Sequence, residues 1–148
     1  MSAQDNIAKV EAGLKAVNEH GIDEFVALLE PDFKLQLILE PATSQSPGAA
    51  NGRDGFRAYL WLLFSAFPDF RMEQVRISAH GNKVYQEIIV YGAHLGEFVL
   101  PNGLKIPPTG LEVRILVEIY HTFNESGGFI SSTGHAKLVD VLKQFGLS

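Results

Sequence analysis

Cysteine is absent from the 148 residues, and the chain has only two methionines and one tryptophan. Without cysteine there is no disulfide framework, no thiol nucleophile and no thiolate metal ligand. Positive charge is also scarce, because twelve Lys and Arg residues face seventeen Asp and Glu residues, which leaves a net charge of −5. Nucleic-acid binding rests on clustered Lys and Arg side chains. We therefore expect no nucleic-acid partner.

Long apolar runs are missing as well. Residues 59–68 are one of the longest nearly uncharged stretches, and a membrane-spanning helix needs about 20 such residues. The first eleven residues carry Asp5, Lys9 and Glu11, and they lack the basic start and apolar run of a targeting signal. We therefore expect a cytoplasmic protein with no membrane partner.

The composition that remains is that of a globular protein, with 46% hydrophobic and 20% charged residues. A chain of this length normally forms one domain, so we expect a single domain over residues 1–148. The sequence has no glycine-rich phosphate-binding loop, no nucleophile elbow and no two histidines four residues apart. We therefore expect neither a cofactor nor a metal ion.

The periodicity of apolar residues predicts helices in the first part of the chain. Residues 7–17 have helical spacing and predict a helix that Gly21 ends, and a second short helix is predicted to end at Pro31. Residues 33–40 alternate between apolar and polar side chains, which predicts a strand. Residues 41–52 are rich in Pro, Ser, Gly and Ala, and they predict a long loop that is a candidate lid.

A third helix is predicted between Arg53 and Pro68, with apolar residues around much of its circumference, including Trp61 and Leu62 on the flank. Such a pattern is typical of an enclosed helix. Alternating segments then predict strands and a last helix, over residues 70–78, 83–96, 111–123, 128–135 and, for the helix, 136–145. We expect an α+β fold, in which a strongly curved, mostly antiparallel sheet packs on the N-terminal helices and forms a cone with an apolar pocket.

Short motifs occur in order along the second half of the chain. They are Phe-Pro-Asp at 67–69, Gly-Ala-His-Leu-Gly-Glu-Phe at 92–98, Pro-Pro-Thr-Gly at 107–110 and Gln-Phe-Gly at 144–146. In this order the motifs resemble those of the SnoaL-like polyketide cyclases and ester cyclases, which belong to the nuclear transport factor two-like superfamily. The resemblance covers most of the chain. It implies a conical α+β barrel that forms a homodimer or higher homo-oligomer through its sheet.

The resemblance also implies a chemistry. Well-understood members close a ring in an aromatic polyketide ester by intramolecular aldol condensation, without a cofactor or a metal. Their base is a carboxylate at the end of the last strand, which removes a proton from carbon between carbonyl groups. In this sequence Lys137 stands seven residues before Gln144, in the place of the family's catalytic Asp. The family's base is therefore not carried over to this chain.

Several side chains are candidates to replace that base. A histidine is a base at neutral pH without any pKa shift, and a lysine with a lowered pKa can act as a base or bind an enolate oxygen. The catalytic candidates are His121, His135, His94 and Lys137. The candidate substrate-binding residues are Trp61, Phe64, Tyr59, Tyr91 and Phe123. For the histidines the alternative is a structural role in the core or at a strand end, and periodicity alone does not separate the two.

We therefore expect a cofactor-free cyclase, isomerase or lyase that acts by acid–base catalysis on a polyketide-like or other polycyclic carbonyl compound in an apolar pocket. Two alternatives stay open. The missing carboxylate favours a non-catalytic protein that binds an apolar or aromatic small molecule. The second alternative is an enzyme of the epoxide hydrolase type, which would need two carboxylates and a positioned water. Its candidate residues are Glu112, Arg114 and Glu118, which share one strand face. The default role of such charged residues is pairing between strands on an outer surface.

Overall fold

The computed structural model of the protein describes residues 2–41, 48–99 and 103–147, and it has the predicted α+β fold. The helices are α1 (Ala3–Asn18), α2 (Ile22–Val26), α3 (Gly52–Ala66) and α4 (Leu138–Gln144). The strands are β1 (Leu29–Glu40), β2 (Gly48–Asn51), β3 (Arg71–His80), β4 (Lys83–Ala93), β5 (Phe98–Val99), β6 (Lys105–Ile106), β7 (Glu112–Phe123) and β8 (Phe129–Lys137). None of these described helices is long and apolar enough to cross a membrane.

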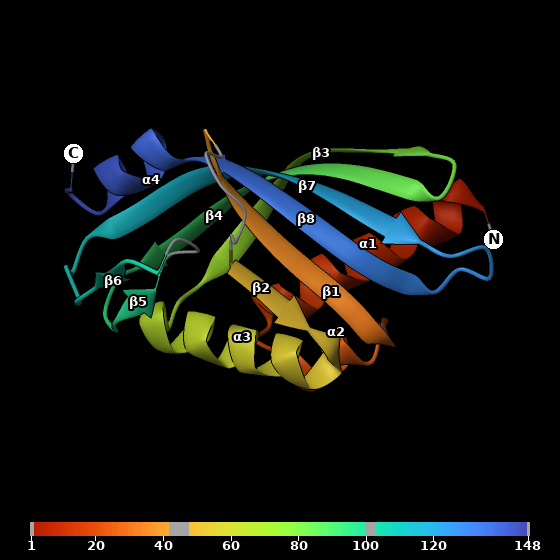
Figure 1. Ribbon diagram of the computed structural model, residues 1–148, viewed down its shortest axis with the longest axis horizontal. Coiled ribbons are helices and arrows are strands. Elements are labelled where there is room, and N and C mark those ends of the chain that lie inside the picture. Colours follow the sequence, from red (N-terminus) through yellow and green to blue (C-terminus); the bar gives the residue numbers. More distant parts are fainter. Residues whose placement is uncertain (1, 42–47, 100–102, 148) are drawn as a thin grey trace.

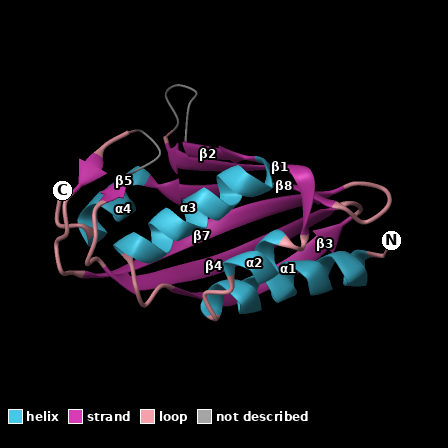
Figure 2. Cartoon of the chain, turned by 90° about the horizontal axis from the view of Figure 1, so that it is seen from below, coloured by secondary structure: helices cyan, strands magenta, loops and turns pink. Residues whose placement is uncertain are grey.

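Six strands form one curved sheet in the order β2-β1-β8-β7-β4-β3, and β5 and β6 form a separate small hairpin. Neighbouring strands are antiparallel except for β1 and β8, which pair in parallel. The helices α1, α2 and α3 all lie on one face of the large sheet (Figures 1 and 2). That face is therefore the inside of the molecule, and the other face has no helix of the described chain packed over it.

The beginning of α1 shows how local sequence starts a helix. The hydroxyl of Ser2 accepts a hydrogen bond from the backbone N–H of Asp5 at 3.1 Å, and the Asp5 carboxylate accepts one from the Ser2 N–H at 3.3 Å. This reciprocal arrangement is a capping box, which satisfies two backbone donors that the helix leaves unpaired. It fixes the start of the helix that carries Val10 and Val17 into the core.

The predicted end of the second helix at Pro31 is wrong. Helix α2 ends at Val26, and Pro31 lies inside β1, where the pairing with β8 is irregular between Leu29 and Lys34. Proline has no backbone N–H to donate to a sheet, so it is tolerated in a strand at such an irregularity. Strand β1 begins at Leu29, before the alternating pattern starts at residue 33. The pattern misses the first residues because the irregular region interrupts the alternation.

The predicted loop over residues 41–52 is also partly wrong. Gly48–Asn51 forms β2, which pairs with residues 34–37 of β1. A stretch of small residues has no strand-like pattern of its own, and its pairing with β1 comes from tertiary structure. Residues 42–47 of that segment lie outside the described residues, and the role of the segment as a lid stays a prediction.

Helix α3 is not enclosed, which corrects the prediction made from its apolar circumference. Phe56, Leu60 and Leu63 face the interior, while Trp61 is 64% exposed and Leu62 is 61% exposed. The sheet covers only one side of the helix (Figure 2). A single layer of helices on a sheet leaves the outer side of each helix to solvent, whatever its composition.

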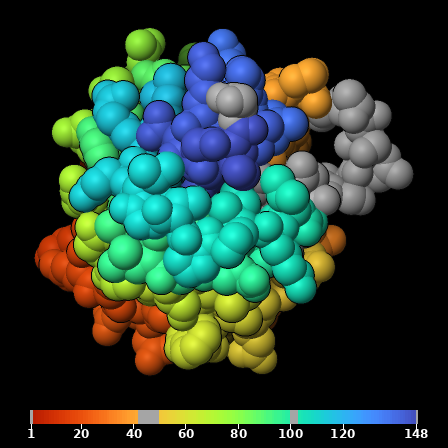
Figure 3. Space-filling model, turned by 90° about the vertical axis from the view of Figure 1, so that its left-hand side faces the viewer, coloured from red at the N-terminus to blue at the C-terminus, as the bar shows by residue number. Residues whose placement is uncertain are grey.

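The last helix and the β5–β6 hairpin lie at one end of the molecule. Figure 3 looks onto this end, where α4 in blue lies above residues 93–99 and 103–112 and α3 lies below them. Gly146 follows α4 with a φ of 70° and caps it. These elements cover one end of the space between the sheet and α3.

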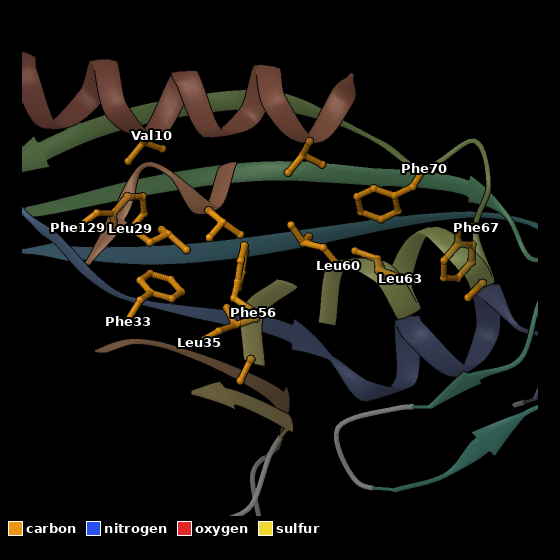
Figure 4. Close-up of a cluster of buried hydrophobic side chains, with 14 of the residues drawn as sticks. Val10, Leu29, Phe33, Leu35, Phe56, Leu60, Leu63, Phe67, Phe70 and Phe129 are labelled. Atoms are coloured by element: carbon orange, nitrogen blue, oxygen red, sulfur yellow. The ribbon is translucent and has the colours of Figure 1, made fainter. Parts of the chain in front are cut away.

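The core consists mainly of aromatic and aliphatic side chains from all layers. Figure 4 shows Val10 of α1, Leu60 and Leu63 of α3 and Phe129 of β8 pointing into one shared space. The ring of Phe33 lies edge-on to the rings of Phe56 and Phe129, at centroid distances of 5.3 and 5.4 Å. Such edge-to-face pairs are favourable arrangements of aromatic rings.

Candidate functional site

An apolar cavity lies between the inner face of the sheet and the helices, with a volume of about 210 Å³. One buried water needs only about 10–15 Å³ on the same scale, so the cavity has room for a ring-containing small molecule. Among the described residues, those that line the cavity include no charged side chain. Its polar side chains are Tyr59, Gln86, His121 and Ser132. An apolar pocket with a few polar groups is the usual form of a small-molecule site.

The alternation of strand residues explains why these polar groups face inward. On β7 the residues Val113, Ile115, Val117, Ile119 and His121 line the cavity, as the period of two requires. On β8 the lining residues are Ser132, Gly134 and Ala136. The chain packs tightly at Gly134, since a Cβ atom added there would come within 3.2 Å of Leu37 on the neighbouring strand β1.

His121 is the centre of the polar group. It is 6% exposed, its Nδ1 lies 2.7 Å from the hydroxyl oxygen of Ser132, and its Nε2 lies 2.9 Å from the side-chain oxygen of Gln86. Both ring nitrogens therefore have hydrogen-bond partners. Burial lowers the pKa of His121 to about 3, because a charged imidazolium loses its hydration inside the protein. His121 is neutral at neutral pH.

Tyr59 adds a second kind of polar group to the cavity. Burial raises the pKa of its hydroxyl to about 12, because a phenolate would lose its hydration. The hydroxyl therefore stays protonated over the physiological range and can donate a hydrogen bond to a carbonyl oxygen. Tyr59 lines the cavity, and its contact with a substrate stays a prediction.

His94 lies outside the lining of the cavity, which corrects the expectation that it is a cavity group. The residue is fully buried, and its Nδ1 lies 2.9 Å from the hydroxyl of Thr109 and 3.2 Å from the Thr109 backbone nitrogen, which donates to it. Its ring packs against those of Phe67 and Phe145. Burial lowers the pKa of His94. The contacts hold the motif segments around residues 94 and 109 together.

His135 and Lys137 face the same side of β8, and that side is the outer face of the sheet. His135 Nδ1 lies 3.8 Å from Glu40, and the ring is edge-on to Tyr120. Lys137 is exposed at the end of the strand. The expectation that His135 is a cavity group is therefore corrected, since from Ser132 to Ala136 the residues of β8 that line the cavity are the even-numbered ones.

Four predicted substrate-binding residues also lie outside the cavity lining, namely Trp61, Phe64, Tyr91 and Phe123. Trp61 points to solvent, and Phe64 stacks on the ring of His20 at 4.1 Å. Tyr91 is on the outer face, where its ring contacts Arg71 and its hydroxyl donates to Glu73. Phe123 is inward but packs on Phe129 at 4.6 Å in the core.

Sequence reasoning missed Gln86 and Ser132. Gln86 stands among inward apolar residues of β4, between Val84 and Ile88, and is 3% exposed. A polar residue at an inward position of an otherwise apolar strand is a signal that the sequence contained. Ser132 had no comparable signal, because serine is common on both faces of strands and at their ends.

A family model described as a SnoaL-like domain matches residues 10–132. No curated protein is significantly similar to this chain in sequence. Among solved structures, a proposed SnoaL-like polyketide cyclase from Jannaschia sp. CCS1 has a TM-score of 0.80 and 19% sequence identity, covering 99% of this chain and 94% of that one. These matches extend over nearly the whole described fold.

Two further structures have related folds. AclR, a proposed hydroxylase from Streptomyces galilaeus, has a TM-score of 0.74 and 21% identity, covering 98% of each chain. SalBIII, described as an epoxide hydrolase/cyclase-like enzyme with a role in pyran ring formation in the polyether salinomycin, has a TM-score of 0.70 and 18% identity, covering 93% of this chain and 94% of its own. At these identities the likeness concerns the fold.

Proposed function

This chain belongs to the SnoaL-like domain family, and we propose that it is a cofactor-free cyclase or isomerase for a polyketide-like or other polycyclic carbonyl compound. The observation that carries the proposal is the buried pair of His121 and Ser132 at the cavity, with 2.7 Å between Nδ1 and Oγ. A hydroxyl next to a neutral imidazole is a proton-transfer pair. The apolar lining matches a substrate made mostly of rings.

The proposed step is the removal of a proton from carbon next to a carbonyl group. Ser132 Oγ takes the carbon-bound proton while its own proton moves to Nδ1 of His121, and the electrons of the broken C–H bond form an enolate. Tyr59, whose hydroxyl stays protonated, donates a hydrogen bond to the enolate oxygen. The pKa of about 3 makes His121 a weak base before this step, but a negative enolate beside it favours the imidazolium.

The experiment that tests the proposal is exchange of carbon-bound hydrogen for deuterium in D2O. The probe is α-tetralone, a bicyclic aromatic ketone, and the loss of its α-proton signal is followed by NMR with and without protein. We expect the protein to accelerate the exchange over buffer at the same pD. Binding of α-tetralone without any acceleration would contradict the enzymatic proposal.

That outcome would instead support a second function, a non-catalytic protein that binds an apolar small molecule. The observation that favours this candidate is the lowered pKa of His121, together with the absence of carboxylates from the described lining of the cavity. The same absence gives no support to chemistry of the epoxide hydrolase type, which needs two acids. Glu118, one of the two acidic candidates from the sequence, accepts a hydrogen bond from Tyr85 on the outer face at 2.8 Å.

We also propose that the outer face of the sheet forms a homodimer. Leu116 and Tyr120 of β7 are exposed there, at 52% and 46%, and apolar side chains on an open sheet face favour association. We expect light scattering to give about twice the chain mass of 16.3 kDa. Leu116→Glu should yield the monomer, and Leu62→Glu, at an exposed leucine of α3, should leave the dimer intact. A monomeric unaltered protein would contradict this proposal.

A further inference from the structure

A continuous chain of hydrogen-bonded side chains leads from the surface to the cavity. The carboxylate of Glu11 on α1 lies 2.9 Å from the side-chain nitrogen of Gln74 on β3, and the side-chain oxygen of Gln74 lies 2.9 Å from the nitrogen of Gln86 on β4. Gln86 then contacts His121, and His121 contacts Ser132. Five elements, α1, β3, β4, β7 and β8, contribute one side chain each. The first member is exposed, and the last three are buried.

The position of Gln74 depends on an irregularity of β3. The pairing of β3 with β4 shifts between Gln74 and Arg76, and Val75 is left as an extra, exposed residue. Gln74 pairs with the inward-facing Ile88, and beyond the shift Ile77 pairs with Gln86. If the register continued from Gln74 without the shift, Arg76 would stand opposite Gln86. A β-bulge of this kind re-aims side chains, and here it aligns the two glutamines.

The direction of every hydrogen bond in this chain follows from the Glu11 carboxylate at its exposed end. An ionised carboxylate only accepts, so Gln74 must turn its NH2 group toward Glu11 and its oxygen toward Gln86. Gln86 must then donate to Gln74 and turn its own oxygen toward His121. A neutral imidazole has one N–H, and the Gln86 oxygen requires it at Nε2. Nδ1 is therefore the acceptor, and the Ser132 hydroxyl donates its proton to it.

We propose that Glu11 sets the tautomer of His121 through this chain, and that the cavity therefore presents the Ser132 oxygen to its ligand as a hydrogen-bond acceptor. A ligand that fits the acceptor carries a hydroxyl on its ring system, as an enol or a phenol does. The inference rests on the proposed function in one respect, because the Ser132 oxygen that accepts the ligand's hydrogen bond is also the atom that accepts the proton in the proposed reaction. Glu11 is a positioning residue, because it touches neither the cavity nor the reacting atoms.

The tautomer is tested by NMR of 15N-labelled protein, in which two-bond correlations distinguish a protonated from an unprotonated ring nitrogen. The His121 signals are identified by their loss in His121→Gln. We expect Nε2 to carry the proton in the unaltered protein. In Glu11→Lys the outer group only donates, every hydrogen bond of the chain reverses, and the major form of His121 should change to Nδ1–H.

Glu19→Lys is the matched control, because it makes the same charge change on an exposed residue at the C-terminal end of α1. We expect it to leave His121 in the Nε2–H form. An Nδ1–H form in the unaltered protein would overturn the inference, and so would an unchanged tautomer in Glu11→Lys. Neither result depends on turnover, so failure of the inference is distinguishable from the absence of α-tetralone exchange.

The ligand class is tested with two probes that share one ring system. Binding of 2-naphthol, which has a hydroxyl donor, is compared with that of 2-methoxynaphthalene, which has none, by equilibrium dialysis. We expect the unaltered protein to bind 2-naphthol at least tenfold more tightly, since the ether leaves the buried acceptor unpaired. In Glu11→Lys the preference should disappear, because Ser132 then donates into the cavity. Equal affinity of the unaltered protein for both probes would contradict the assignment of an acceptor.

Discussion

Exchange of the α-protons of α-tetralone is expected to fall about 10²–10⁴-fold when His121 or Ser132 is replaced by alanine, the usual contribution of a positioned acid–base group. The two side chains act as one unit, since Ser132 takes the carbon-bound proton only if His121 takes the proton of Ser132. The double variant should therefore be no slower than either single variant. Binding of the ketone, measured by equilibrium dialysis, should survive because the apolar lining is unchanged.

The matched controls lie on β8, the strand of Ser132, but on its opposite face. Ser131→Ala and His135→Ala change residues whose side chains face the outer side of β8, and both variants should keep the exchange rate of the unaltered protein. A large loss in His135→Ala with none in His121→Ala would reverse the assignment. It would restore the sequence-based expectation that His135 is the base.

The second large effect is the dependence of stability on pH. The pKa of His121 is about 3 in the folded protein and about 6.5 in the unfolded chain. Between these values the unfolded chain binds a proton at this residue and the folded protein does not, so acidification favours unfolding. We expect the free energy of unfolding to fall by about 2–3 kcal/mol between pH 6 and pH 4 from this residue alone.

Urea unfolding at a series of pH values measures this contribution. In His121→Gln the residue no longer titrates, so the loss of stability between pH 6 and pH 4 should be smaller than in the unaltered protein by about that amount. Burial also lowers the pKa of His94, but that residue is present in both proteins. Parallel curves for the unaltered protein and His121→Gln would contradict a buried, neutral His121.

The family and the fold class were accessible from local sequence. The motifs at residues 67–69, 92–98, 107–110 and 144–146 stand in a fixed order, and the matching family model confirms the resemblance. The inner face of α1, the capping glycine Gly146 and most strands follow from short-range periodicity and turn chemistry. These features depend on residues only a few positions apart.

The composition of the site was less accessible, because it depends on which face of each strand points inward. His121 and His135 were equally plausible from the pattern, and a shift of one residue exchanges the two faces of a strand. The register of β7 and β8 places His121 opposite Ser132 and His135 opposite Glu118. That pairing joins residues eleven or more positions apart, so no local pattern contains it.

Short-range patterning alone therefore identifies most of the helices and strands and the family. It gives His121 only as one of several candidate residues. Only the packed chain decides that Gln86, His121 and Ser132 meet at one cavity, that Trp61 is left to solvent and that Pro31 lies within a strand. The physical reason is that helices and turns form from contacts between near neighbours. The cavity forms from the register of distant strands and from which side of each helix the sheet covers.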